Sequence, residues 1–258
     1  MSPLSTPPLK IIGHRGNKNL ENALPSFEEA LQHGAKGIEF DIQLSSDLVP
    51  VVIHDETLDR TTTGFGTVSH YPYSQLQDLR LKDIHQQKTT HAIPTLKQVL
   101  ELCARWTTWI PDLWINVEIK DPRATIPVLS LIDCFIHSGS LKEHHVVLSS
   151  FDHHVLYRVR KENPSLPLGI LFEDEQLHAI AALVKDLKPV SLHFNQYQMK
   201  TPHAQSLRGK IPFVAWFAKE PLFPENLTML EDSVHYGALT LITNHPAEVV
   251  NHRVKVKP

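Results

Sequence analysis

The sequence predicts an α/β protein of the TIM-barrel class, a single (β/α)₈ barrel, and three observations support this. The chain has 258 residues, which is near the typical length of one such barrel. Short apolar runs alternate with longer amphipathic stretches along the whole chain, which is typical of repeated βα units around a parallel sheet. We find no internal repeat and no linker that would divide the chain, so we expect one domain over residues 1–258.

Eight short apolar runs are predicted to be the barrel strands. They span residues 10–12, 37–44, 113–119, 145–148, 166–171, 189–194, 211–216 and 239–243. A helical stretch follows nearly every run, because apolar residues recur there at the three- and four-residue spacing of a helix face. The predicted helices include residues 23–32, 95–105, 126–137, 153–162 and 227–236.

The segment from 50 to 93 departs from this alternation. A strand-like Val51-Val52-Ile53 is followed by sequence rich in Thr, Gly, Tyr, Pro and Gln, with little helical period. We interpret residues from about 55 to 93 as an insertion after the second barrel strand, since a loop this long in a compact domain is usually functional or disordered. Residues 61–66, Thr-Thr-Thr-Gly-Phe-Gly, are predicted to form a turn.

Composition and charge restrict the class of partner. The chain is 41% hydrophobic and 21% charged, with a formal net charge of -3, so it lacks the basic surplus that favours nucleic acid or an anionic membrane. Binding of any phosphate group must therefore depend on a few basic residues at one site rather than on the overall charge. No apolar run approaches the ~18 residues of a membrane span, and residues 1–8 lack the apolar region of a signal peptide. We expect a cytoplasmic protein without stable membrane insertion.

The two cysteines fall inside apolar helical patterns. Cys103 ends Val-Leu-Glu-Leu-Cys, and Cys134 lies in Leu-Ile-Asp-Cys-Phe. Both are expected to be buried free thiols, which is the usual state of such residues and argues weakly for a reducing compartment.

Two carboxylates lie two residues apart in the second predicted strand. In Gly-Ile-Glu-Phe-Asp-Ile, Glu39 and Asp41 share a face if the segment is a strand. Like charges placed together are costly unless a cation neutralises them, and a hard cation such as Mg²⁺ or Ca²⁺ prefers carboxylate oxygens. The alternative is an exposed polar face at a sheet edge, and this segment alone does not decide between the two.

A third carboxylate ends the next predicted barrel strand. Glu118 and Lys120 also share a face, and neighbouring strand ends of a barrel converge on one mouth. Glu39, Asp41 and Glu118 are thus predicted to form a metal site, with Lys120 ready to meet an anionic substrate. A simple salt bridge between Lys120 and Glu118 is the structural alternative.

Two histidines lie where such a site needs proton carriers. His14 closes the first strand in Ile-Gly-His-Arg-Gly, and His54 ends the run Val-Val-Ile-His-Asp. Each follows a strand-like run and stands beside Gly or Asp residues that permit tight turns. The remaining histidines of the 17 in the chain lack this context.

The order of these motifs resembles that of the glycerophosphodiester phosphodiesterase family. The Ser-Ser-Phe at 149–151, Trp216 after an apolar strand, and Ile-Thr-Asn-His-Pro at 242–246 also resemble family landmarks, so the similarity covers nearly the whole chain. The motifs of the first half are His14-Arg15-Gly16, Glu21-Asn22, Glu39-x-Asp41, Asp47, His54-Asp55, Leu58-x-Arg60-Thr61-Thr62-x-Gly64-x-Gly66 and Glu118-x-Lys120.

The resemblance implies a TIM barrel with a small insertion after the second strand, and a phosphoric diester hydrolase that converts glycerophosphodiesters to an alcohol and glycerol 3-phosphate. It implies one divalent ion, Mg²⁺ or Ca²⁺, and nucleophilic attack by the glycerol 2-hydroxyl through a cyclic phosphate. The site residues that it implies are Glu39, Asp41 and Glu118 for the ion, His14 and His54 as the acid–base pair, Arg15 and Lys120 for the phosphate, and Trp216 near the organic part of the substrate. As a working hypothesis, His54 protonates the leaving oxygen and His14 activates the nucleophile.

Four departures from the family pattern concern the shape of the pocket rather than the reaction. The usual Pro-Glu-Asn-Thr reads Leu-Glu-Asn-Ala at 20–23, Asp-Gly reads Asp-Leu at 47–48, Trp-Thr-Val-Asn reads Trp-Phe-Ala-Lys at 216–219, and Thr-Asp reads Thr-Asn at 243–244. One alternative is a lysophospholipase D-like enzyme, to which the Pro-Leu-Phe-Pro at 221–224 would lend an apolar entrance. The other is a catalytically inactive binding barrel.

Overall fold

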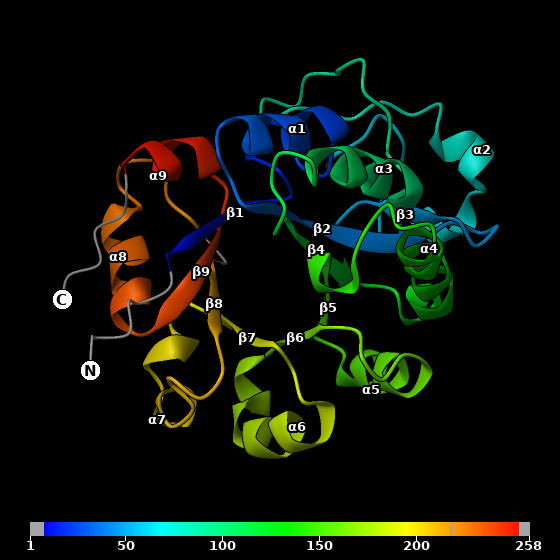
Figure 1. Ribbon diagram of the computed structural model, residues 1–258. Helices are drawn as coiled ribbons and strands as arrows, with labels where there is room; N and C mark the ends of the chain where they lie inside the picture. Colours follow the sequence, from blue (N-terminus) through cyan, green and yellow to red (C-terminus); the bar gives the residue numbers. More distant parts are fainter. Residues whose placement is uncertain (1–7, 218, 253–258) are drawn as a thin grey trace.

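The computed structural model describes residues 8–217 and 219–252, and these form a closed barrel of parallel strands with helices around it (Figure 1). The TIM-barrel prediction is confirmed. The expectations that concern residues 1–7 and Ala218 lie outside the described residues.

Eight parallel strands make the barrel. β1 pairs with both β2 and β9, which closes the sheet in the order β1-β2-β4-β5-β6-β7-β8-β9. All eight predicted runs are strands, with ends that differ by a few residues. Their bounds are β1 Lys10–His14, β2 Gly37–Leu44, β4 Trp114–Ile119, β5 Val146–Ser150, β6 Leu168–Leu171, β7 Ser191–Asn195, β8 Phe213–Trp216 and β9 Ala238–Thr243.

Local signals in the sequence explain where several helices begin. Thr95 and Gln98 form a reciprocal capping box at the start of α3, and the side chain of Asp152 accepts from the backbone N–H of His154 at the start of α5. The helices are α1 Leu24–Gln32, α2 Tyr73–Leu76, α3 Leu96–Trp106, α4 Thr125–His137, α5 His153–Glu162, α6 Ile180–Leu187, α7 Pro202–Gln205, α8 Leu227–His235 and α9 Pro246–His252.

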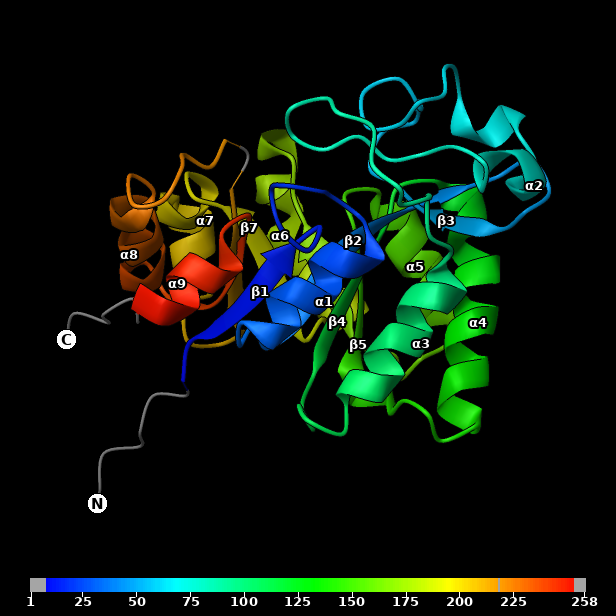
Figure 2. The same ribbon diagram turned by 90° about the horizontal axis from the view of Figure 1, so that it is seen from above.

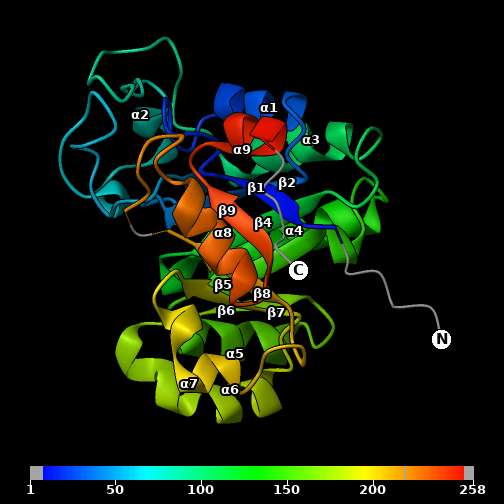
Figure 3. The ribbon, with the colours of Figure 1, turned by 90° about the vertical axis from the view of Figure 1, so that its left-hand side faces the viewer.

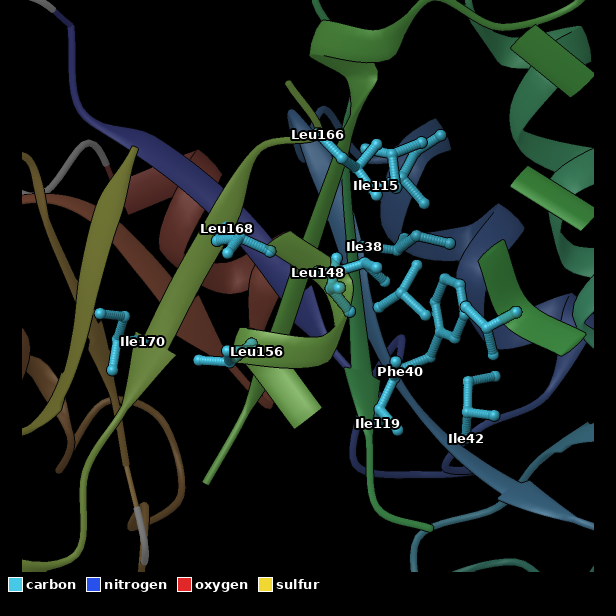
Figure 4. Packing of buried hydrophobic residues seen from close by; sticks show 14 of the residues in the cluster. Ile38, Phe40, Ile42, Ile115, Ile119, Leu148, Leu156, Leu166, Leu168 and Ile170 are labelled. Atoms are coloured by element: carbon cyan, nitrogen blue, oxygen red, sulfur yellow. The ribbon is translucent and has the colours of Figure 1, made fainter. Parts of the chain in front are cut away.

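The main core lies between the strands and the helices. In β2, Ile38, Phe40 and Ile42 are fully buried and belong to a cluster that includes residues of β4 to β6 (Figure 4). Because successive strand residues alternate between faces, Glu39 and Asp41 point to the other face, into the barrel. Burial of the apolar face thus fixes the direction of both carboxylates.

The insertion forms a small structured unit after β2. A short strand just before it, β3 Pro50–Val52, pairs antiparallel with β2, and a separate apolar cluster includes Leu58, Val68 and Leu76 of the insertion. The predicted turn at 61–66 lies in a loop that is closed where the Leu58 N–H donates to the Gly66 carbonyl at 2.9 Å. Figures 2 and 3 show the insertion at one side of the barrel, where the Ile84 N–H donates to the carbonyl of Asn19 in the β1–α1 loop.

One expectation for the cysteines is wrong. Cys103 is buried, and burial raises the pKa of its thiol, but Cys134 is exposed. Two residues along an α-helix rotate the side chain by about 200°, so Cys134 points away from the core that Ile132 of the same helix contacts. Among the residues described, no helix is both long and apolar enough to cross a membrane.

Candidate active site

A cavity of about 410 Å³ opens at the carboxyl ends of the strands, and we call it the first cavity. One side is ionic and the other is mostly apolar. The ionic side is lined by His14, Arg15, Glu39, His54, Asn116, Glu118 and Lys120, and the opposite side by Phe151, Leu171, Glu173, His193, Trp216, Phe217 and Ile242. The cavity therefore brings together the predicted ionic residues from β1, β2, β4 and the start of the insertion.

The three predicted carboxylates form one buried cluster. One oxygen from each of Glu39, Asp41 and Glu118 lies within 4.8 Å of the others. The register explains this, because Asp41 of β2 pairs directly with Glu118 of β4, and paired residues of parallel strands point to the same face. Glu39 is 3% exposed and Asp41 is 1% exposed, so the alternative of an exposed polar edge is wrong.

Two basic side chains contact the cluster. Lys120 forms ion pairs with Glu118 and, at 3.3 Å, with Asp41; Arg15 Nε lies 3.2 Å from Asp41 Oδ2, and the same guanidinium donates to Glu21 at 2.6 Å. The simple Lys120–Glu118 salt bridge considered from the sequence is thus present, but Lys120 also reaches Asp41 and lines the first cavity.

Backbone strain at the β1–α1 loop supports the same cluster. Arg15 has φ 50°, in the left-handed region that non-glycine residues rarely adopt, and its backbone N–H donates to Glu39 at 3.1 Å. Asn22 has φ 56° and its side-chain amide donates to Asp41 at 2.9 Å. Such strain persists only where surrounding contacts hold it, and it concentrates at functional sites.

The electrostatics of the cluster indicate a deficit of positive charge. Burial and the charges of Asp41 and Glu118 raise the pKa of Glu39 well above its usual range, and burial raises the pKa of Glu118 to about 7. Burial acts in the same sense on Asp41, but Lys120 and Arg15 overcome it and hold the pKa of Asp41 below its ordinary value. Glu39 Oε1 has no hydrogen-bond partner among the described residues. A divalent cation would correct both the charge and the unpaired oxygen.

The two predicted histidines have different partners. His14 Nδ1 lies 2.9 Å from Asn244 Oδ1, while its Nε2 is 3.8 Å from Glu39; burial and the charge of Arg15 lower the pKa of His14 to about 3. His54 Nδ1 lies 2.7 Å from Asp55 Oδ1, and burial lowers the pKa of His54. Since an amide or carboxylate oxygen only accepts, Nδ1 donates in both rings and Nε2 keeps the lone pair.

Asp55 and Asn244, the partners of the two histidines, are themselves held by further contacts. The Arg60 fork donates to both oxygens of Asp55, at 2.6 and 2.9 Å, and Arg60 also pairs with Glu21. On the other side, the Asn244 N–H donates to Glu220 at 2.6 Å. Asp55 and Arg60 belong to the motif order noted in the sequence, whereas Glu220 carried no sequence signal.

Sequence reasoning missed several residues of the first cavity. Asn116 shares a strand face with Glu118, and its side chain donates to Ser149 at 3.1 Å. The two-residue spacing between Asn116 and Glu118 could have identified it from the sequence. His193 is fully buried in β7 and accompanies apolar neighbours, so it did not stand out among the other histidines. Trp216 was predicted, and Phe151 packs edge-on against it with ring centroids 5.6 Å apart.

A second cavity of about 400 Å³ adjoins the first, and both are lined by His14 and Arg15. Four segments build it: the β1–α1 loop, the insertion, the β8–α8 loop and the β9–α9 loop. Its other lining residues include Lys18, Glu21, Arg60, Lys82, Asp83, Ile84, Phe217, Glu220, Leu222 and Asn244. The two cavities therefore meet at His14, Arg15 and Phe217.

Comparison with known proteins agrees with this geometry. The glycerophosphodiester phosphodiesterase of Caldanaerobacter subterraneus is 38% identical over 168 residues, which cover 63% of this chain and 66% of that protein, just under two thirds of its length. The crystal structure of glycerophosphodiester phosphodiesterase from Thermotoga maritima is 28% identical with a TM-score of 0.72, covering 95% of this chain and 98% of that one. A phosphodiesterase structure from Oleispira antarctica, 21% identical with a TM-score of 0.79 and covering 95% and 97% of the two chains, shares the fold.

The family model described as the glycerophosphoryl diester phosphodiesterase family matches residues 14–233. This range contains the carboxylate cluster, both histidines, Arg15 and Lys120. Since the match covers most of the sequence, the chain belongs to the glycerophosphoryl diester phosphodiesterase family, a family of phosphoric diester hydrolases.

Proposed function

We propose that this protein hydrolyses glycerophosphodiesters to glycerol 3-phosphate and an alcohol, with one divalent ion and two histidines. The observation that carries the proposal is the first cavity, where a buried three-carboxylate cluster faces two histidines and two basic side chains. The Oleispira antarctica structure holds the product sn-glycerol-3-phosphate, which supports the same substrate class for this chain.

The donor set fits a hard divalent cation. Glu39, Asp41 and Glu118 would hold one Mg²⁺ or Ca²⁺ ion, because their oxygens converge and one of them is unpaired among the described residues. When bound, such an ion supplies positive charge where negative charge develops on the phosphoryl oxygens. Arg15 and Lys120 border the same space and would hold the phosphate by charge and hydrogen bonds.

The partners of the two histidines favour distinct tasks. Asp55 beside His54 stabilises the imidazolium that forms when Nε2 accepts a proton, so His54 suits the base that activates the nucleophile, either water or the glycerol 2-hydroxyl. His14 is neutral in the ligand-free site, because burial and Arg15 lower its pKa to about 3. An anionic phosphate beside it would favour protonation of Nε2, and with only a neutral amide partner the imidazolium would then give up that proton readily. The phosphorus–oxygen bond to the alcohol would then break as His14 protonates the departing oxygen. Where the 2-hydroxyl is the nucleophile, water must afterwards open the cyclic phosphate to give glycerol 3-phosphate, with the proton transfers of the two histidines reversed. This assignment is the reverse of the working hypothesis from the sequence.

A panel of glycerophosphodiesters with different alcohols tests the proposed function. The purified chain would be assayed after chelation and again with Mg²⁺, Ca²⁺ or Mn²⁺ restored, and the release of glycerol 3-phosphate would be measured. We expect turnover with at least one ion and none in excess chelator. Absence of hydrolysis under every condition would leave the inactive binding barrel as the better description.

A lysophospholipase D-like activity is the second candidate. Ile84 and Leu222 line the second cavity while remaining 50% and 59% exposed, and exposed apolar side chains at a cavity rim favour an acyl chain. Lysophosphatidylcholine belongs in the same panel. Faster release of choline from it than from glycerophosphocholine would favour this candidate.

A further inference from the structure

The second cavity contains two ammonium groups that its own carboxylates do not neutralise. Lys18 and Lys82 are half-buried and line it, and neither forms an ion pair with any residue within 8–217 or 219–252. Lys82 Nζ donates at 2.8 Å to the Asp59 carbonyl, which leaves its charge uncompensated. These two lysines come from different segments, the β1–α1 loop and the insertion.

The carboxylates of the second cavity are committed to other partners. Glu21 is bound by Arg15 and Arg60, and Asp83 accepts from the backbone N–H groups of His85 and Gln87. Glu220 accepts from Thr243, Asn226 and the Asn244 N–H. Arg15 and Arg60 are committed in the same way, to Glu21, Asp41 and Asp55. Lys18 and Lys82 are thus the lining basic side chains that have no ion-pair partner among the described residues.

A phosphodiester has two arms, and the two cavities meet where its phosphate would lie. His14 and Arg15 line both cavities, so a phosphate held there extends one arm into each. The arm common to all substrates of the class, glycerol, suits the first cavity, whose aromatic wall and buried His193 offer a fixed shape. The alcohol that varies suits the second, with its half-exposed rim.

We propose that the second cavity binds the leaving alcohol and that Lys18 and Lys82 select an alcohol bearing a negative charge, such as a carboxylate. This inference deepens the proposed function and rests on it. A carboxylate near these ammonium groups gains Coulomb attraction that a neutral or purely cationic alcohol lacks. The insertion thus contributes one of two specificity determinants, and neither lysine touches the carboxylate cluster.

Two substrates that differ by one carboxylate test this directly. Glycerophosphoserine and glycerophosphoethanolamine share the glycerol arm, the phosphate and the ammonium, and kcat/KM would be measured for both. We expect the native protein to prefer the serine diester by about fivefold at low ionic strength, which is the size of a partly exposed charge pair. Lys18→Met and Lys82→Met should each reduce the preference, and the double variant should bring it near unity. Raising the salt concentration should reduce the native preference in the same way.

Controls separate this inference from the proposed function. Lys97→Met changes the net charge equally at a lysine that is 65% exposed on α3, and it should keep the native preference; Lys82→Arg should keep most of it. Turnover of glycerophosphoethanolamine should remain within about twofold in Lys97→Met, whereas loss of either cavity lysine should not lower it, because its alcohol carries an ammonium and no carboxylate. The proposal would be overturned if the native protein hydrolysed both diesters equally well. It would also be overturned if the preference survived in the double variant or fell equally in Lys97→Met. None of these outcomes would contradict the proposed hydrolase function. A protein inert on both diesters would refute the proposed function instead.

Discussion

Strands β1, β2 and β4 and strands β5 to β9 bury similar apolar side chains against their helices, yet they present different groups to the first cavity. The first set contributes His14, Glu39 and Glu118, in rows fixed by the pairing of His14 with Glu39 and of Asp41 with Glu118. The second contributes Leu171, Trp216 and other mostly apolar side chains.

Under the proposed function, we expect the ionic side to perform the reaction and the apolar side to accommodate the organic part of the substrate. Charges can cooperate only when they lie within a few ångströms, so they come from adjacent strands in one register. The apolar side of the cavity needs only a suitable shape and polarity to contact the substrate, and side chains from several strands can provide these. Substitutions on the two sides should therefore affect different kinetic constants.

Loss of the divalent ion should produce the largest effect, because it removes the main charge on the ionic side. We expect excess chelator to reduce turnover by ~10³-fold or more, and Glu39→Gln, Asp41→Asn or Glu118→Gln each to raise the ion concentration for half-maximal activity by about tenfold or more. Titration of the rate with Mg²⁺ or Ca²⁺ measures this. Glu101→Gln, at an exposed position on α3, is the control, and full activity in chelator would exclude a metal-dependent reaction.

Removal of either histidine should slow hydrolysis of glycerophosphocholine by ~10²–10⁴-fold. The two variants should differ on a nitrophenyl diester, because that leaving group departs without a proton. We expect His14→Ala to recover much of its relative rate there and His54→Ala to remain impaired on both substrates, with His91→Ala in the exposed part of the insertion as the control. The opposite pattern would exchange the two roles, and equal losses on both substrates would mean that His14 positions groups rather than donating a proton.

Arg15→Lys should have an intermediate effect, because the charge survives but the planar fork does not. The guanidinium of Arg15 contacts both Glu21 and Asp41. A lysine ammonium cannot keep both contacts and bind a phosphate at the same time. We expect kcat/KM to fall by about tenfold or more, the scale of one charge-assisted hydrogen bond. Steady-state kinetics of this variant and of Arg105→Lys, exposed on α3, would be compared; equal kinetics in the two would place Arg15 outside the reaction.

Trp216→Ala should have the smallest effect and should act mainly on KM. Trp216 packs against Phe151 on the apolar wall, so its loss weakens contacts that the substrate makes in the ground state and the transition state alike. We expect KM for glycerophosphocholine to rise by roughly three- to tenfold, the equivalent of about 1 kcal/mol of aromatic contact, while kcat changes little. Trp109→Ala, at a residue 78% exposed, should change neither, and a larger effect on kcat than on KM would contradict the division between the two sides.

The sequence by itself determined the barrel, the carboxylate cluster and its basic partners. Alternation of apolar and polar residues in β2 is a local property, so it showed that Glu39 and Asp41 share a face before any neighbour was known. The same logic placed Glu118 and Lys120 on the next strand. Local patterns also gave all eight barrel strands, because each buried strand is a short apolar run whatever its position in the ring.

Only the tertiary structure decided which segments meet across the barrel. The buried His193, the contact of Glu220 with Asn244 and the second cavity all depend on residues far apart in the chain. A polar residue in an apolar strand looks the same in sequence whether it faces a core or a cavity. Likewise, Lys18 and Lys82 are ordinary lysines until the fold places them at one cavity without an acidic partner in the described chain, because electrostatic neighbours are set by distance in space rather than by order along the chain.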